Sequence, residues 1–159
     1  MTGSFQLTSS DWRDGGPIAS AFAYPACGGG NRSPALAWSN VPAGTLSFAV
    51  TIHDPDAPRP GGWWHWVVFD IPATATGLPS GPGGRGLPAG AKAARNDFGE
   101  AGYGGPCPPP GKPHRYVAAV WALSVEHLRG DASSSSAEMA RQIQASALAK
   151  SEIVGLYGR

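Results

Sequence analysis

Two aspartates and two histidines stand out as groups that could do chemistry together. Asp54 and Asp56 lie in the rigid stretch DPDAPRP, His65 follows in GGWWHWVV, and His114 comes after GPCPPPGKP. A carboxylate that accepts a hydrogen bond from one ring nitrogen of a histidine fixes the tautomer, raises the histidine pKa and leaves the other nitrogen for a ligand. Such a set would bind a small anion, such as a phosphate or carboxylate group.

The same groups allow a second interpretation, in which the protein is an enzyme. His65 and His114, oriented by Asp54, could act as general acid and base in a cyclisation, isomerisation or lyase step on a small molecule. The sequence lacks the motifs G-x-S-x-G, Walker loop and H-E-x-x-H, so we favour binding over catalysis. The two histidines and two aspartates are spaced too irregularly along the chain to predict a metal site, and no other cofactor is indicated. His53 and His127 have no companion groups.

Each of these residues also has an ordinary structural explanation. A histidine on a buried strand is more often a satisfied core residue than a ligand-binding group, so neither His65 nor His114 establishes a site by itself. Asp54 precedes a proline and suits a turn, and Asp56 could accept backbone N–H bonds in the next turn. The site therefore depends on whether the fold brings the four residues together.

Three predicted strands must position these groups. Residues 46–53 alternate between apolar and polar side chains, which predicts a strand with one buried face. Residues 63–71 and 115–125 are apolar on both faces, as expected for central strands. The aspartates follow the first strand, His65 begins the second and His114 precedes the third. Their ends can converge at one rim of the sheet.

The remaining elements are weaker strands, long loops and one helix. Ser135 and Glu138 form a capping box, and apolar residues then recur every four positions along one helical face. We predict a helix at 136–150, strands at 5–8 and 35–38, glycine- and proline-rich loops at 77–92 and 96–113, and a short extended tail.

Composition predicts one compact domain over residues 1–159, because 42% of the 159 residues are hydrophobic. The formal net charge of +1 gives no electrostatic basis for nucleic-acid binding. No basic and apolar leader begins the chain, and no run of about 18 apolar residues occurs, which predicts a cytoplasmic protein without a membrane span. Cys27 and Cys107 lack a C-x-x-C spacing and are expected to be reduced thiols.

Six stretches resemble the phosphatidylethanolamine-binding protein family, most closely its bacterial branch of Raf kinase inhibitor-like proteins. They follow the family's order over nearly the whole chain, and DPDAP with a downstream P-H-R-Y is a specific combination. The stretches are SPALAW (33–38), DPDAP (54–58), GWWHWVVFDIP (62–72), RNDFG (95–99), YGGPCPPPGKPHRY (103–116) and IVGLYGR (153–159).

The resemblance implies a mostly β fold. This is a β-sandwich in which a large antiparallel sheet packs on a smaller one, with a helix near the C-terminus. Cis peptide bonds are expected before Pro58 and between Gly61 and Gly62, and Arg115 is expected to be a structural ion-pair partner. The family's anion pocket maps onto Asp54, Asp56, Trp63, His65, Cys107, Pro108, His114 and Tyr116.

The resemblance also implies a function. It predicts a protein that captures a small anion, or a phosphorylated head group like that of a phospholipid, without integral membrane association. Kinase inhibition, a protein partner and a homodimer follow as family-level expectations.

Overall fold

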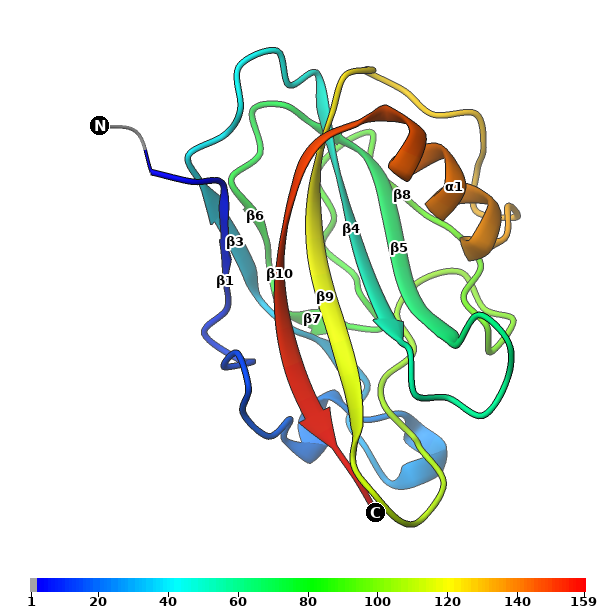
Figure 1. The fold of residues 1–159 in the computed structure, drawn as a ribbon. Coiled ribbons are helices and arrows are strands. Elements are labelled where there is room, and N and C mark those ends of the chain that lie inside the picture. The colour runs from blue at the N-terminus through cyan, green and yellow to red at the C-terminus, as the bar shows by residue number, and fades with distance from the viewer. Residues whose placement is uncertain (1–2) are drawn as a thin grey trace.

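A large antiparallel sheet frames the molecule. The computed structural model describes residues 3–159, and five strands pair antiparallel throughout this sheet. Figure 1 shows the sheet as a twisted layer that runs along the molecule. In spatial order its strands are β10 (Ala147–Tyr157), β9 (His114–Leu123), β4 (Ser47–Asp54), β5 (Trp63–Pro72) and β8 (Lys92–Ala93).

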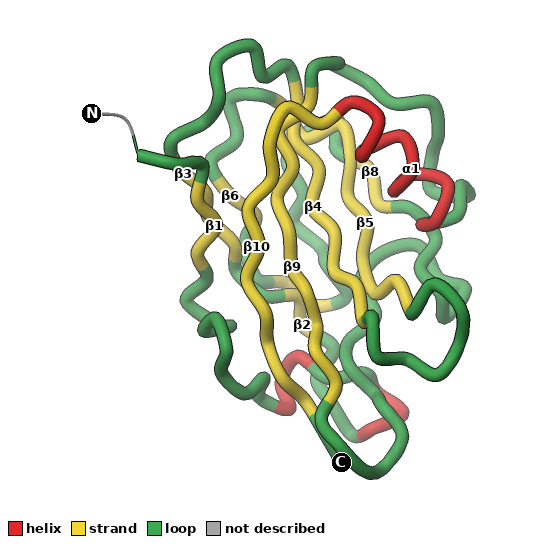
Figure 2. Tube along the Cα trace, in the orientation of Figure 1, coloured by secondary structure: helices red, strands yellow, loops and turns green. Residues whose placement is uncertain are grey.

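Smaller sheets cover one face of the large sheet and enclose the main core. Phe48 of β4 packs on Trp38 of β3 with ring centroids 5.2 Å apart, and both side chains are buried. In Figure 2 the short strands lie as a second layer behind the long ones. The three-stranded sheet has the order β1 (Gln6–Thr8), β3 (Leu36–Ser39) and β6 (Gly77–Leu78), and β2 (Arg32–Ser33) pairs with β7 (Gly81–Pro82). The predicted sandwich is confirmed.

Helix α1 (Ser136–Ser146) covers part of the opposite face. The Ser135 hydroxyl accepts the Glu138 N–H as predicted, and Met139 and Ile143 are buried in a second apolar cluster with side chains of the large sheet. The helix has 11 residues, and no helix within residues 3–159 is long and apolar enough to cross a membrane. Two short 3-10 turns, η1 (Ser20–Phe22) and η2 (Pro25–Cys27), complete the helical elements.

The three long predicted strands are confirmed, with ends displaced by at most two residues. The prediction for the C-terminal segment was wrong in extent, because the helix stops at Ser146 and the tail is the long strand β10. Strand β10 pairs with β9 from Ala147 to Tyr157, so the sheet satisfies backbone groups that a longer helix would have used. The predicted domain includes residues 1 and 2, which lie outside the described residues.

The expectation of cis peptide bonds in the turn between β4 and β5 was wrong. Among residues 3–159 every peptide bond is trans. The chain reverses instead through Gly61 and Gly62, whose φ angles of 80° and 70° are left-handed. A side chain at Gly62 would lie 2.3 Å from the Asp54 carbonyl oxygen, so only glycine fits. The same two glycines therefore close the turn without the proline isomer that the family suggested.

Candidate anion-binding site

Three strand ends meet at one rim of the large sheet. Strand β4 runs antiparallel to both β5 and β9, so its C-terminal end lies beside the N-terminal ends of both neighbours. Asp54 is paired with Trp63 in this register, and His53 with Val117. The arrangement places Asp54, His65 and His114 together, as the sequence allowed.

A cavity of about 200 Å³ opens at this rim. Six of the eight predicted pocket residues line it, and Asp54 and Asp56 do not. The lining also includes four residues that sequence reasoning missed, although DPDAP, RNDFG and the proline run pointed to their segments. The cavity is lined by Trp63, His65, Cys107, Pro108, His114 and Tyr116, together with Ala57, Pro58, Phe98 and Pro109.

His65 is a buried, uncharged histidine. Its Nδ1 donates to the Gly104 carbonyl oxygen at 2.7 Å, so Nε2 is left as an acceptor while the ring is neutral. Burial lowers the pKa of His65 from its ordinary 6.5 to about 4. The rings of Phe98 and Tyr116 contact the imidazole edge-on, with centroids 5.6 and 5.1 Å away. A backbone carbonyl therefore orients this ring, where a carboxylate had been predicted.

His114 has the predicted carboxylate partner. Its Nδ1 lies 2.7 Å from the Asp54 Oδ2, and Asp54 is buried behind the ring. The other carboxylate oxygen, Oδ1, accepts the Asp56 N–H at 2.8 Å. Asp54 thus positions His114 from behind and closes the turn, and protonation of His114 would make the contact an ion pair.

Asp56 lies outside the cavity lining and pairs with Arg115. Its Oδ2 accepts from the Arg115 backbone N–H at 2.8 Å and from Nε at 3.1 Å, and its Oδ1 accepts from the guanidinium at 2.8 Å. The hydrogen-bonded guanidinium lowers the pKa of Asp56 to about 2. Arg115 is the structural ion-pair partner that was expected, and Asp56 anchors the turn to β9 without contributing to the lining.

Two donors of the lining have no partner in the described part of the chain. The Tyr116 hydroxyl and the Trp63 Nε1–H are buried, and neither makes a hydrogen bond with any residue of 3–159. Burial raises the pKa of Tyr116, and the nearby Asp54 carboxylate raises it further, so the phenol keeps its proton. Buried donors are normally paired. Neither atom is exposed to the cavity, so a ligand oxygen would pair with these groups only after neighbouring side chains of the lining move.

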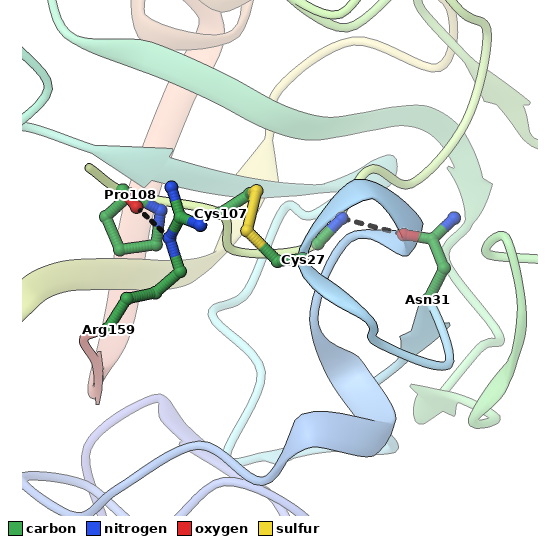
Figure 3. Close-up of a disulfide and its surroundings, with 6 residues drawn as sticks. Cys27, Asn31, Cys107, Pro108 and Arg159 are labelled. Carbon is green, nitrogen blue, oxygen red and sulfur yellow. Dashed lines mark hydrogen bonds between the residues drawn. A yellow bond between two sulfur atoms is a disulfide. The ribbon is translucent and has the colours of Figure 1, made fainter. Parts of the chain in front are cut away.

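The two cysteines of the chain are bonded to each other. Cys27 and Cys107 form a disulfide with a Cα separation of 5.6 Å, so the expectation of reduced thiols was wrong. Figure 3 shows the bond joining the segment that carries Asn31 to the stretch that carries Pro108. The two residues are 80 positions apart, and sequence spacing gives no sign of such a contact. Cys107 also lines the cavity.

The other histidines have structural contacts. His53 Nε2 lies 2.7 Å from the Gly61 carbonyl oxygen, and His127 Nδ1 lies 3.4 Å from the buried Asp70 carboxylate. No group of three or more His, Cys, Asp or Glu residues within 3–159 could hold a metal ion. The side chains of the cavity lining include the imidazoles of His65 and His114, the Tyr116 phenol and the Trp63 indole.

Comparison with known proteins assigns the fold to a family. A model of the phosphatidylethanolamine-binding protein family matches residues 8–158. The chain belongs to this family. Among its relatives, YbcL of Escherichia coli is 49% identical over 97% of this chain and 87% of its own length. YbhB of Escherichia coli is 42% identical over 96% of this chain and 99% of its own length.

Solved structures of the family agree with the fold. The crystal structure of Escherichia coli YbcL, described as a new member of the mammalian family, matches with a TM-score of 0.95 and 48% identity, covering 99% of each chain. A homologue from Chlamydia trachomatis matches with a TM-score of 0.82 and 30% identity, covering 98% of each chain. The family's sandwich is therefore shown along essentially the whole chain.

Proposed function

We propose that this protein binds a small oxyanion, such as a phosphate or carboxylate group carried by a larger molecule, in the cavity beside His65 and His114. The observation that carries the proposal is that His65 and His114 line the same cavity, with Nδ1 of each ring held by an acceptor and Nε2 left for a ligand. Both residues line a cavity whose volume of about 200 Å³ equals that of about seven waters. This space takes a phosphate together with a few further atoms of a head group.

The histidines make the proposed binding depend on protons. In both rings Nδ1 is held by an acceptor, so each Nε2 can donate to an anion only when its ring is protonated. A protonated ligand oxygen could instead donate to the neutral His65 Nε2. Either route couples binding to a bound proton, so we expect oxyanions to bind more tightly as the pH falls.

The family association supports a regulatory role for the proposed binding. In it, a protein partner recognises the chain with its pocket occupied, as expected for a kinase-inhibitor-like protein, and a homodimer remains a prediction. The cytoplasmic location also stays a prediction. The disulfide weighs against it, because such bonds persist mainly in oxidising compartments.

An enzyme is the second candidate, because the cavity exceeds the size of a phosphate ion and His65 is neutral with Nε2 free to accept a proton. Proton transfer by His65 in a cyclase, isomerase or lyase step would use the same rim. Nuclear magnetic resonance of bound phosphoethanolamine separates the two candidates for this ligand. A spectrum that stays unchanged over hours supports binding alone, and new resonances support catalysis.

Calorimetric titration with phosphate, phosphoethanolamine and acetate tests the proposal. We expect His114→Ala to weaken phosphate binding by about 10- to 100-fold, the effect of losing a charge-assisted hydrogen bond of roughly 1.5–3 kcal/mol. His65→Ala should weaken it by about 2- to 10-fold, because the neutral ring loses an ordinary hydrogen bond of roughly 0.5–1.5 kcal/mol. His127→Ala is the matched control, because this histidine lies outside the lining and should leave the affinity unchanged. Absence of binding by all three ligands, or wild-type affinity in His114→Ala, would contradict the proposal.

A further inference from the structure

One wall of the cavity is a loop with few backbone hydrogen-bond donors. Cys107, Pro108 and Pro109 line the cavity, and Pro106 and Pro110 flank them. Proline has no backbone N–H, so four of these five residues cannot donate to a neighbouring strand. Other links must hold this stretch, named here the proline wall (residues 106–110), in place.

The links before Cys107 join the proline wall to the segment that follows η1. The Tyr24 N–H donates to the Pro106 carbonyl oxygen at 2.9 Å. One residue earlier, the Gly105 N–H donates to the Asn31 Oδ1 at 2.8 Å. These two bonds fix the entrance of the wall to residues 24–31, and Figure 3 shows the second of them beside the disulfide.

The links after Cys107 both run to a single residue. The Arg159 Nε–H donates to the Pro108 carbonyl oxygen at 2.6 Å, and the Gly111 N–H donates to the Arg159 carbonyl oxygen at 3.2 Å. Both depend on one exposed residue, Arg159. In Figure 3 its side chain lies beside Pro108 and Cys107.

The disulfide attaches the centre of the wall to a well-formed turn. Cys27 ends η2, where its N–H donates to the Tyr24 carbonyl oxygen at 3.0 Å and the Gly28 N–H donates to Pro25 at 2.9 Å. Cys107, its partner, lies in the cavity lining. The bond therefore connects a fixed turn directly to the surface that a ligand would touch.

We propose that the Cys27–Cys107 disulfide is a redox control of the cavity, in which the oxidised form holds the proline wall in place for binding. This inference rests on the proposed anion binding. Both cysteines are half-buried, so a small thiol can approach them. A dithiol reductant attacks one sulfur to give a mixed disulfide, and its second thiol then releases the protein. Two electrons and two protons pass to the protein, which gains two thiols, while the reductant becomes a disulfide.

Reduction should weaken binding because the wall would no longer be held in one position. Binding to a site that is correctly formed for only a fraction of the time is weakened by that fraction. If the reduced wall is in place about a tenth of the time, the dissociation constant rises about tenfold. The strand residues His65 and His114 would keep their positions, because the sheet holds them without the disulfide.

The experiment measures inorganic phosphate affinity in the oxidised protein, in protein reduced with dithiothreitol and in Cys27→Ser. Cys27 is the residue to change because Cys107 touches the cavity. Dithiothreitol is uncharged and does not compete for an anion site. We expect the dissociation constant to rise about tenfold in both the reduced protein and the variant. Dithiothreitol should change nothing further in the variant, and reoxidation should restore the wild type.

Amide hydrogen exchange gives a second readout that needs no ligand. In the reduced protein we expect exchange at Gly105 and Tyr24, whose N–H groups hold the wall, to become much faster than exchange at Val50 in the core strand β4, which opens only on global unfolding. An equal phosphate affinity in oxidised and reduced protein overturns the redox control, as does exchange at Gly105 and Tyr24 that stays as slow as at Val50, because the disulfide would then act only through the stability of the whole fold. Absence of phosphate binding in the oxidised protein contradicts the proposed function itself. Exchange at Gly105 and Tyr24 then decides alone whether the disulfide fixes the wall.

Discussion

The two walls of the cavity are built in different ways. The strand wall carries Trp63, His65, His114 and Tyr116 on β5 and β9, where β4 pairs with both strands and the neighbouring core is fully buried. The loop wall carries Pro58, Phe98 and residues 107–109 on segments that lie outside the strands. The strand wall is fixed by the sheet, whereas the loop wall depends on a few long-range links.

Because of this difference, the strand wall carries the polar groups of the cavity, and the loop wall affects how tightly a ligand binds. Imidazole, phenol and indole groups belong to the strand wall, so the positions of the proposed donors and acceptors are set when the sheet forms. The loop wall contributes mainly apolar surface and one half of a disulfide. Changes in the loop wall should therefore alter affinity and stability while leaving the arrangement of the histidines intact.

The largest expected effect on stability concerns the loop wall. Cys27→Ser removes a cross-link between residues 80 positions apart, and closure of a loop of this length should contribute about 4 kcal/mol to the free energy of unfolding. Urea denaturation should show this loss in the variant, and the same loss in the wild type with dithiothreitol. Equal midpoints with and without the disulfide would mean that the other links to residues 24–31 already fix the wall.

The strand wall should make stability depend on pH through His65. Because burial lowers its pKa from 6.5 to about 4, the unfolded chain binds a proton in this window and the folded chain does not. Stability should therefore fall as the pH decreases from 6.5 to 4, by about 3 kcal/mol from this residue. His65→Asn keeps a donor for the Gly104 carbonyl and should show a flatter profile by urea denaturation. Parallel wild-type and variant profiles would contradict the assignment of His65 as buried and neutral.

Substitutions of the two aspartates should differ in their effects on stability and affinity, and the larger effects are expected at Asp54. Asp54→Ala leaves the His114 Nδ1 and the Asp56 N–H without their acceptor, and should cost about 2–3 kcal/mol of stability together with at least tenfold of phosphate affinity. The affinity loss arises because nothing then orients His114. Urea denaturation and calorimetry measure the two losses. Wild-type phosphate affinity in Asp54→Ala would show that the carboxylate does not position the ring.

The smallest effect is expected at Asp56. Its pairing with Arg115 is partly exposed, so Asp56→Ala should cost less than about 1 kcal/mol, and phosphate affinity should stay within about twofold of the wild type. The same calorimetric titration measures it. A tenfold loss of affinity in Asp56→Ala would return this residue to the binding site and contradict its position in the structure.

The sequence predicted the strand wall better than the loop wall. Alternation and doubly apolar runs located β4, β5 and β9, and antiparallel pairing then brought Asp54, His65 and His114 together. Contacts between loops have no periodic signal, so the disulfide, the lining position of Phe98 and the Gly104 carbonyl that orients His65 could not be derived from spacing. The Arg115 ion pair was anticipated, but its partner Asp56 was assigned to the pocket, because two carboxylates only two residues apart look equivalent in sequence.

The most direct test of the central claim compares two buried tyrosines. Tyr116 lines the cavity with an unpartnered hydroxyl, whereas the Tyr103 hydroxyl donates to the Phe22 carbonyl oxygen at 2.7 Å. We expect Tyr116→Phe to keep or gain about 1 kcal/mol of stability and to weaken phosphate binding about tenfold, because a donor that can pair with a ligand once the lining moves is lost. Tyr103→Phe should lose about 1–2 kcal/mol and keep wild-type affinity. Unchanged phosphate affinity in Tyr116→Phe would contradict the claim that this cavity binds an oxyanion through its unpartnered donors.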